Sequence, residues 1–192
     1  QKVLKALRQA DYLSPKYHVV VANPPYMGQK GMNASLKKLS KKSYDDAKRD
    51  LGVMFIERSH GLTSPRGYAA LITMQSWMFL ATYEDFRRSI LDRAAIRSMM
   101  HLGERAFDTI GGAVVSTTAF VLAKHSDTEF VANYRRLVDG GSEAEKQELF
   151  LSDTSARFTA SIHDFTAVPG MPVAYWVSND FREVFKTGTC VR

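Results

Sequence analysis

The stretch that decides the fold reads VVVANPPY and occupies residues 19–26. Its first four residues form an uninterrupted apolar run with three β-branched side chains, which is typical of a strand buried on both faces of a parallel sheet. Pro24 and Pro25 must end that strand, because proline has no N–H to donate to the hydrogen-bond ladder. Asn23 is therefore expected at the carboxyl end of a parallel strand, where open α/β sheets bind their ligands.

Apolar patterns typical of strands and of helices alternate on both sides of this stretch. This alternation predicts the α/β class with parallel strands. The last two strands have no helix between them, which predicts an antiparallel hairpin at one edge of the sheet. The expected elements are a helix ending before Ser14, strands at 19–22, 68–74, 96–102 and 113–123, and helices beginning near Ser43 and Thr82. Weaker patterns after Lys124 predict a strand at 129–138 and helices at 143–149 and 181–185.

Composition argues against several classes of protein. The 192 residues are enough for one domain with a core, and the net charge of +6 is compatible with an anionic partner. The single cysteine, Cys190, excludes a disulfide framework and suits a reducing cytoplasm, and the five histidines are too dispersed to predict a metal site. The apolar runs are too short to span a bilayer and residues 1–10 do not resemble a signal peptide, so no membrane partner is expected.

The chain resembles the amino-group DNA methyltransferases of the class I (Rossmann-like) methyltransferase fold, in which this motif is (D/N/S)PP(Y/F/W). The resemblance covers about residues 1–125 and includes the strands GYAALIT at 67–73 and VSTTAFVL at 115–122. The sequences ANPPYMG at 22–28 and AYWVS at 174–178 are most similar to the large adenine-specific PglX methyltransferases of BREX phage-defence systems and their restriction-modification relatives. The resemblance implies site-specific methylation of adenine N6 in double-stranded DNA, with S-adenosylmethionine as methyl donor.

The residue types of the motif suit that chemistry. The exocyclic amine of adenine is a poor nucleophile, because its lone pair is delocalised into the ring. Two acceptors, the side-chain oxygen of Asn23 and the backbone carbonyl of Pro24, can hold the amino hydrogens, and the φ angles fixed by Pro24 and Pro25 preorganise the site. Tyr26 offers a flat face to a base flipped out of the duplex. The resemblance places a second stacking group at Phe107, whose alternative role is that of an ordinary core aromatic.

Residues 27–44 contain five lysines and no acidic residue. We predict a loop that is mobile or irregular in the absence of DNA, because like charges repel and few apolar residues anchor it. Lysines beside the target pocket suit phosphate contacts, and the alternative is a solvated surface. The lysines are Lys30, Lys37, Lys38, Lys41 and Lys42.

The family's glycine-rich cofactor loop does not precede the motif, and Gly28 and Gly31 follow it at the wrong spacing. We therefore expect a fragment in which residues 1–125 are the C-terminal, target-base half of the catalytic domain. Residues 126–192 are expected to extend toward a target-recognition or accessory region. Such a fragment retains only Asn23 of the cofactor site, lacks the N-terminal half of the enzyme, and is expected to be inactive alone. The edge of the 19–22 strand is expected to be open and to form an oligomer contact or be covered by another segment.

Two alternative functions remain open from the sequence. Enzymes with the same motif also methylate glutamine amides in proteins and bases in RNA, because each of these substrates presents a planar amino group. A chain without its cofactor half is alternatively a non-catalytic DNA-binding or assembly module.

Overall fold

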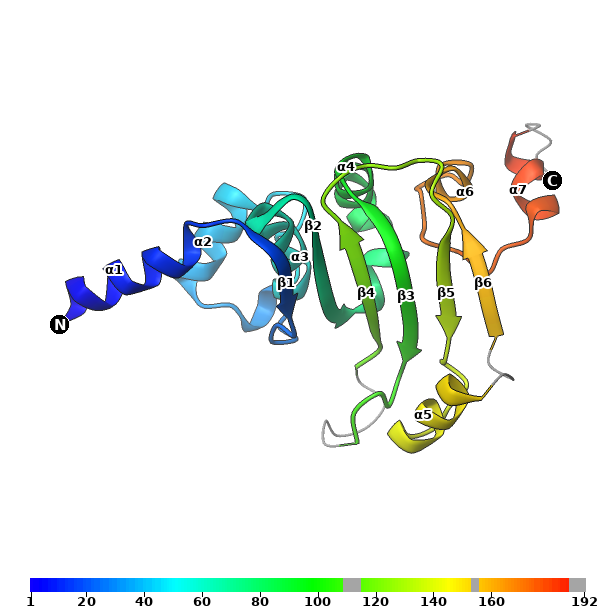
Figure 1. Ribbon diagram of the computed structural model, residues 1–192, viewed down its shortest axis with the longest axis horizontal. Coiled ribbons are helices and arrows are strands. Elements are labelled where there is room, and N and C mark those ends of the chain that lie inside the picture. The colour runs from blue at the N-terminus through cyan, green and yellow to red at the C-terminus, as the bar shows by residue number, and fades with distance from the viewer. Residues whose placement is uncertain (109–114, 153–155, 187–192) are drawn as a thin grey trace.

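The computed structural model describes residues 1–108, 115–152 and 156–186, and within them the strands form one mixed six-stranded sheet (Figure 1). The strand order is β1-β2-β4-β3-β5-β6. The pairs β1–β2 and β3–β5 are parallel, and the other three are antiparallel. The α/β class is therefore confirmed. The strands are β1 (Tyr17–Ala22), β2 (Thr63–Met74), β3 (Ala95–Gly103), β4 (Thr117–Ala123), β5 (Ala132–Arg136) and β6 (Ala156–Ala160).

Two helices cover one face of the sheet, which lies in front of them in Figure 1. The alternating burial of β2 identifies this face, since Ala69, Leu71 and Thr73 are buried while their neighbours Ala70 and Ile72 are partly exposed. The helices that cover it are α3 (Leu51–Leu62) and α4 (Glu84–Arg93). The remaining helices are α1 (Lys2–Leu13), α2 (Ala34–Ser43), α5 (Glu143–Leu151), α6 (Ile162–Thr166) and α7 (Asn179–Lys186), with 3-10 turns η1 (Gln29–Gly31), η2 (Gln75–Met78) and η3 (Ala81–Tyr83).

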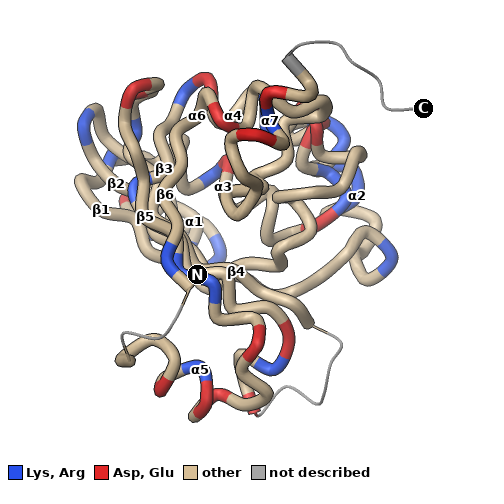
Figure 2. The backbone as a smooth tube through the Cα atoms, turned by 90° about the vertical axis from the view of Figure 1, so that its right-hand side faces the viewer, with Lys and Arg blue, Asp and Glu red and all other residues tan. Residues whose placement is uncertain are grey.

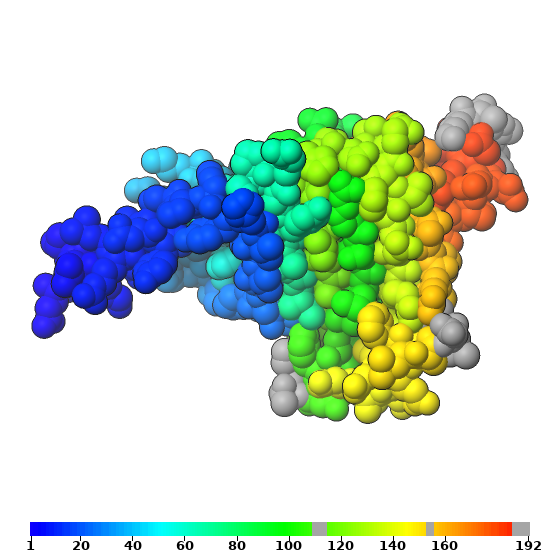
Figure 3. Space-filling model, viewed as in Figure 1, coloured from blue at the N-terminus to red at the C-terminus, as the bar shows by residue number. Residues whose placement is uncertain are grey.

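The strand β1 lies at the edge of the sheet, as predicted. It is not buried on both faces, which corrects the expectation drawn from its apolar sequence: Val21 keeps 75% of its surface exposed and Val19 keeps 60%. The helix α1, which precedes β1, has no buried residue and extends from the body of the molecule as an arm (Figure 3). Among the described residues, no helix packs on the outer face of β1, so its apolar side chains remain uncovered.

The predicted antiparallel hairpin is present as β3 and β4, but it lies inside the sheet. It is not at an edge because β5 pairs with β3 and β6 pairs with β5, which extends the sheet by two strands. The first residues expected in the last hairpin strand, 113 and 114, lie outside the described residues. Part of the segment after residue 125 thus continues the sheet formed by the first segment.

The prediction of a loop over residues 27–44 is wrong for its second half, because residues 34–43 form α2. Asn33 begins this helix, and its side-chain oxygen accepts a hydrogen bond from the backbone N–H of Leu36 at 2.9 Å. Lys41 and Lys42 lie in the last turn, where positive charge interacts favourably with the helix dipole. The next helix, α3, is capped by Asp50 rather than by Ser43, which is the last residue of α2.

Candidate target-base site

The candidate site lies at the carboxyl end of β1, where the parallel strands β1 and β2 present their following residues at the same edge. Ala22 is the last residue of β1, and Asn23 follows with an exposed side chain. Pro24 is buried, which fixes the backbone on which its carbonyl oxygen sits, whereas Pro25 is exposed. Asn23 also borders a shallow hollow of about 280 Å³ on the uncovered face, whose other lining residues include Val21, Ile72, Met100 and Val121.

Tyr26 and Phe107, which the sequence predicts as two stacking groups, are brought together. Their ring centroids lie 6.3 Å apart with the planes tilted by 43°. The Tyr26 hydroxyl is buried and has no hydrogen-bond partner among the described residues, and burial raises the pKa of this phenol. A buried hydroxyl without a partner is rare in a finished protein interior.

The segment after the motif is tied to the N-terminus of α3. Gly28 forms an antiparallel bridge with Asp50, and the backbone N–H of Leu51 donates to the carbonyl of Met27 at 2.9 Å. The Asp50 carboxylate accepts hydrogen bonds from the N–H groups of Gly52 at 2.8 Å and Val53 at 3.4 Å. Burial raises the pKa of Asp50 despite these two hydrogen bonds.

The sequence did not single out Asp50, although a carboxylate directly before an apolar helical pattern is a capping signal. Its role here is to hold the loop that carries Tyr26 against a helix whose apolar side packs into the core.

Four of the five predicted DNA-contacting lysines are exposed, and Lys37 is half-buried. Lys30 lies in η1, and the other four lie on α2, which follows the motif in sequence. Figure 2 shows the Lys positions along α2 in blue. The lysines are thus displayed on an ordered helix close in sequence to the motif, although the sequence predicted a loop.

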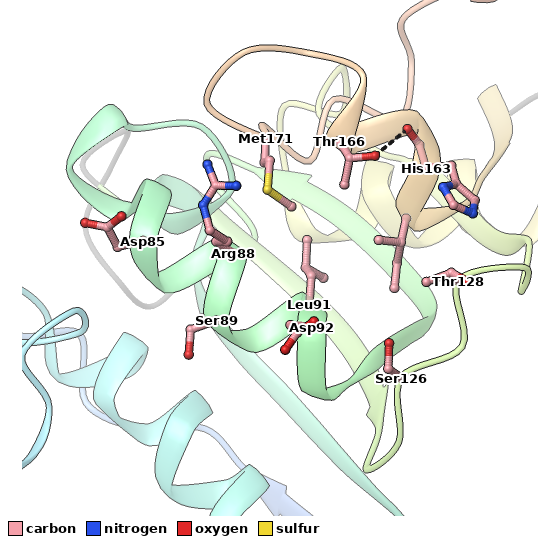
Figure 4. Close-up of a pocket in the computed structure, with 11 residues that line it drawn as sticks. Asp85, Arg88, Ser89, Leu91, Asp92, Ser126, Thr128, His163, Thr166 and Met171 are labelled. Carbon is pink, nitrogen blue, oxygen red and sulfur yellow. Dashed lines mark hydrogen bonds between the residues drawn. The ribbon is translucent and has the colours of Figure 1, made fainter.

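A larger hollow, of about 650 Å³, lies between α4 and α6 (Figure 4). Ser126 and Thr128, which line it, follow the end of β4. Because β4 is antiparallel to β2, that end of β4 lies opposite the end that carries the motif. The size of a hollow therefore does not identify the site. The motif and the paired aromatic rings favour the edge of the sheet at which β1 ends, where the smaller hollow lies.

Among the described residues there is no group of three or more His, Cys, Asp or Glu side chains placed to hold a metal ion. No helix within those residues is long and apolar enough to cross a lipid bilayer.

The class defined by this fold and motif is that of the methyltransferases found in restriction-modification systems. The chain belongs to the Eco57I restriction-modification methylase family, whose sequence model matches residues 4–107. It is 41% identical over 184 residues to the adenine-specific methyltransferase BrxX of Escherichia coli O9:H4 (strain HS). It is 39% identical over 185 residues to the adenine-specific methyltransferase PglX of Lacticaseibacillus casei (strain Zhang). These matches cover 96% and 94% of this chain but only 15% of each relative.

Solved structures share the fold at low sequence identity. The DrdV–DNA complex superposes with a TM-score of 0.62 at 15% identity, over 91% of this chain and 20% of that one. The type IIG restriction endonuclease BpuSI gives a TM-score of 0.60 at 13% identity, over 84% of this chain and 21% of that one. The fold of this chain is therefore shared with solved restriction-modification enzymes.

Proposed function

We propose that this chain is the target-base half of an enzyme that methylates adenine N6 in double-stranded DNA, within a restriction-modification or phage-defence system of the cytoplasm. The observation that carries the proposal is the motif at the end of β1, with Tyr26 facing Phe107 across 6.3 Å. The family membership and the adenine-specific relatives support the choice of adenine over a protein amide or an RNA base. Structural neighbours solved with DNA support the choice of DNA.

In this proposal Asn23 and Pro24 orient the reacting amine. The exposed Asn23 oxygen and the carbonyl of the buried Pro24 accept the two amino hydrogens, which turns the nitrogen lone pair away from the ring. Tyr26 and Phe107 hold the flipped base between their faces, and stacking offsets part of the few kcal/mol that flipping costs. Since the two rings are tilted by 43° in the present structure, a bound base is expected to bring them closer to parallel.

S-adenosylmethionine supplies the methyl group when it is bound, as is general for methyltransferases of this family. Asn23 is the residue of this chain that we place against the donor. The hollow beside it is mainly apolar and has no carboxylate among its described lining residues, so it offers no acidic partner for the donor's ribose hydroxyls. The described residues thus fit one wall of a donor site, and we propose that the N-terminal half of the same enzyme supplies the rest.

The organisation of the longer protein follows from the same features. We assign residues 1–125 to the target-base half of the catalytic domain and residues 126–192 to an extension toward a target-recognition or accessory region. The exposed edge of β1 and the fully exposed α1 suit a surface covered by the N-terminal half or by a second copy of the chain. The lysines of η1 and α2 suit contacts with DNA phosphates.

One assay tests the proposal. The full-length protein is expected to transfer labelled methyl groups from S-adenosylmethionine to adenine in duplex DNA, and not to RNA or to a glutamine-containing protein. Residues 1–192 alone are expected to be inactive and to bind the donor too weakly for detection by calorimetry. Micromolar binding of the donor to residues 1–192 would contradict the division of the site between two halves, and methylation of RNA in preference to DNA would contradict the assigned substrate.

A further inference from the structure

A cluster of polar side chains outside the motif lies at the same edge of the sheet. Gln75 directly follows β2, the strand next to β1, and its backbone N–H donates to the carbonyl of Ser116 at 2.9 Å. His101 lies near the end of β3 and is only 6% exposed. The His101 ring lies between Gln75 on one side and Tyr175 on the other.

The hydrogen bonds of this cluster run in a defined direction. The Gln75 side-chain oxygen, Oε1, only accepts, so the His101 Nε2–H donates to it across 2.6 Å. The other ring nitrogen, Nδ1, then accepts a hydrogen bond from the Tyr175 hydroxyl at 3.0 Å. Burial, assisted by the nearby charges of Arg136 and Lys146, lowers the pKa of His101 to about 4, so the ring is neutral near pH 7 and keeps this arrangement.

The surroundings hold the cluster in place. Tyr175 is buried and stacks on Tyr134 of β5 with centroids 4.7 Å apart and planes 10° from parallel. Trp176 lies 5.9 Å from the His101 ring and 5.4 Å from Phe79, and it keeps 38% of its surface exposed. The sequence AYWVS at 174–178, which has no role in the motif, is thereby fastened to the carboxyl edge of the sheet.

These contacts fix the Gln75 amide and leave one of its ends unused. Its oxygen is engaged by His101, whereas among the described residues no protein acceptor lies within hydrogen-bonding distance of its Nε2. The side chain is only half-buried, so Nε2 is not sealed inside the core. A glutamine held through its oxygen with a free amide nitrogen is a preorganised hydrogen-bond donor.

The topology places this donor beside the paired aromatics. Tyr26 follows β1 and Phe107 follows β3, and in the sheet β2 and β4 lie between those two strands. The centroids of the two rings lie 6.3 Å apart, so the rings meet above the C-terminal end of β2 and the first residue of β4. Gln75 directly follows β2 at this end.

We propose that Gln75 donates a hydrogen bond from Nε2 to a ring nitrogen of the flipped target adenine, and that His101 and Tyr175 are positioning residues that aim it. Adenine carries acceptor nitrogens in its ring, including N7 next to the amino group, so a fixed donor selects among flipped bases. This inference rests on the proposed function, because it requires adenine to enter between Tyr26 and Phe107.

The test combines substrate analogues with variants of the full-length protein. Duplexes carry 1-deaza-, 3-deaza- or 7-deazaadenine at the target position, each of which lacks one ring acceptor. The wild-type protein is expected to lose roughly three- to tenfold in kcat/KM on one of the three, the worth of one hydrogen bond. Gln75→Ala and Gln75→Glu are expected to lose a similar factor on adenine itself and to treat that analogue and adenine alike. Gln75→Glu keeps an acceptor for His101 Nε2, so it separates the lost donor from a lost contact with His101.

Two further variants complete the design. Tyr175→Phe keeps the stacked ring but removes the donor to Nδ1, and it is expected to reduce the discrimination against that analogue while the melting temperature stays close to that of the wild type. Gln147→Ala, on the exposed surface of α5, is the matched control and is expected to keep full discrimination.

Wild-type activity that is equal on adenine and all three analogues, or undiminished discrimination in Gln75→Glu, would overturn the inference while leaving the proposed function intact. Absence of any adenine methylation by the wild-type protein would overturn both.

Discussion

The two ends of the sheet are built differently. At one end, β1 exposes Val19 and Val21 and is preceded by a helix with no buried residue. Toward the other end, Tyr134 of β5 is buried with Phe165 and Tyr175 in a cluster of aromatic rings. The difference teaches that the motif lies at the exposed end of the sheet, whereas the buried aromatic rings gather at the packed end.

A buried arginine strengthens the packed end. Arg87 of α4 is 1% exposed and donates to the backbone carbonyls of Trp77, Leu80 and Met171 at 2.9, 2.7 and 3.0 Å. Burial lowers the pKa of this guanidinium, with the Glu84 charge acting in the opposite direction. The carbonyl contacts join α4 to the chain after α6, so the packed end includes the segment that carries Tyr175. No comparable bond holds α1 to the sheet among the side-chain hydrogen bonds of the described residues, apart from Tyr17 and Arg58 donating to carbonyls at its C-terminal end.

The largest expected effect comes from the motif. Asn23→Ala in the full-length protein removes an acceptor that matters most as the amine becomes a nucleophile, so turnover should fall by about 10²–10³-fold. Because Asn23 is exposed and orients the amine rather than anchoring the DNA, the dissociation constant for DNA should hardly change. Single-turnover kinetics and binding titrations measure the two quantities separately. A parallel loss of DNA affinity would show that Asn23 acts in binding.

The packed end is expected to respond to pH through His101. Its pKa is lowered from about 6.5 to about 4 in the folded chain, so protonation favours the unfolded state. The contribution of neutral His101 to the free energy of unfolding is therefore fully present above pH 6.5 and is lost progressively as the pH falls toward 4. The size of the loss is on the order of 3 kcal/mol.

Denaturant unfolding of residues 1–192 between pH 7 and pH 4 measures this slope. His101→Gln should flatten it. A residual slope is expected, because burial also lowers the pKa of His60. A slope that is equally steep in His101→Gln would assign the acid sensitivity to other groups.

Substitution of Tyr26 is expected to impair a different step from substitution of Asn23. Tyr26→Ala removes a stacking face worth roughly 1–3 kcal/mol per base, so capture of the flipped base should weaken. Fluorescence of 2-aminopurine at the target position reports flipping directly. Tyr26→Phe and Tyr26→Trp should restore much of the signal, since each retains an aromatic face. If Tyr26→Phe is as defective as Tyr26→Ala, the buried hydroxyl rather than the ring is the important group.

The sequence predicted the parts of this architecture that depend on local patterns. The apolar run before the two prolines placed a strand and its end correctly, and the pairing of Tyr26 with Phe107 was predicted from the family resemblance. The exposure of β1 was not predicted from its composition, because burial depends on which segments are present to cover a strand. The interior position of the hairpin was also missed, since the short strand β5 gives only a weak periodic signal.

Two opposing features of the sequence explain why a loop was predicted for residues 34–43, which form α2. The lysines suggested a solvated loop, but lysine is a good helix former. Asn33 supplies the cap and Leu36 packs against the core, which together are sufficient for α2. The cluster of Gln75, His101 and Tyr175 joins three segments far apart in the chain, and no spacing rule relates such residues.

The ordered lysine helix makes a smaller, additive prediction. Each lysine of α2 that contacts a phosphate should contribute about 1 to the slope of log affinity against log salt concentration. Changing Lys37, Lys38, Lys41 and Lys42 to Gln in the full-length protein should therefore flatten the slope and weaken binding to all DNA sequences alike. Lys5→Gln on α1 is the control and should leave the slope unchanged. An unaltered salt slope in the fourfold variant would show that the lysines of α2 do not contact DNA phosphates and only face solvent.

The smallest effect is expected at the exposed end of the sheet, and it distinguishes a free β1 edge from one that is covered in the full-length protein. In residues 1–192, Val21→Lys places a charge on a side chain that is already 75% exposed, so the free energy of unfolding should change by no more than about 0.5 kcal/mol. In the full-length protein the same lysine would be buried under the segment that we propose covers β1, and the melting temperature should fall, because a buried unpaired charge is strongly destabilising. Val131→Lys, at a site of similar exposure before β5, should be neutral in both proteins. Equal tolerance of Val21→Lys in both proteins would mean that the β1 edge stays open in the whole enzyme, and the cofactor half would then have to dock elsewhere.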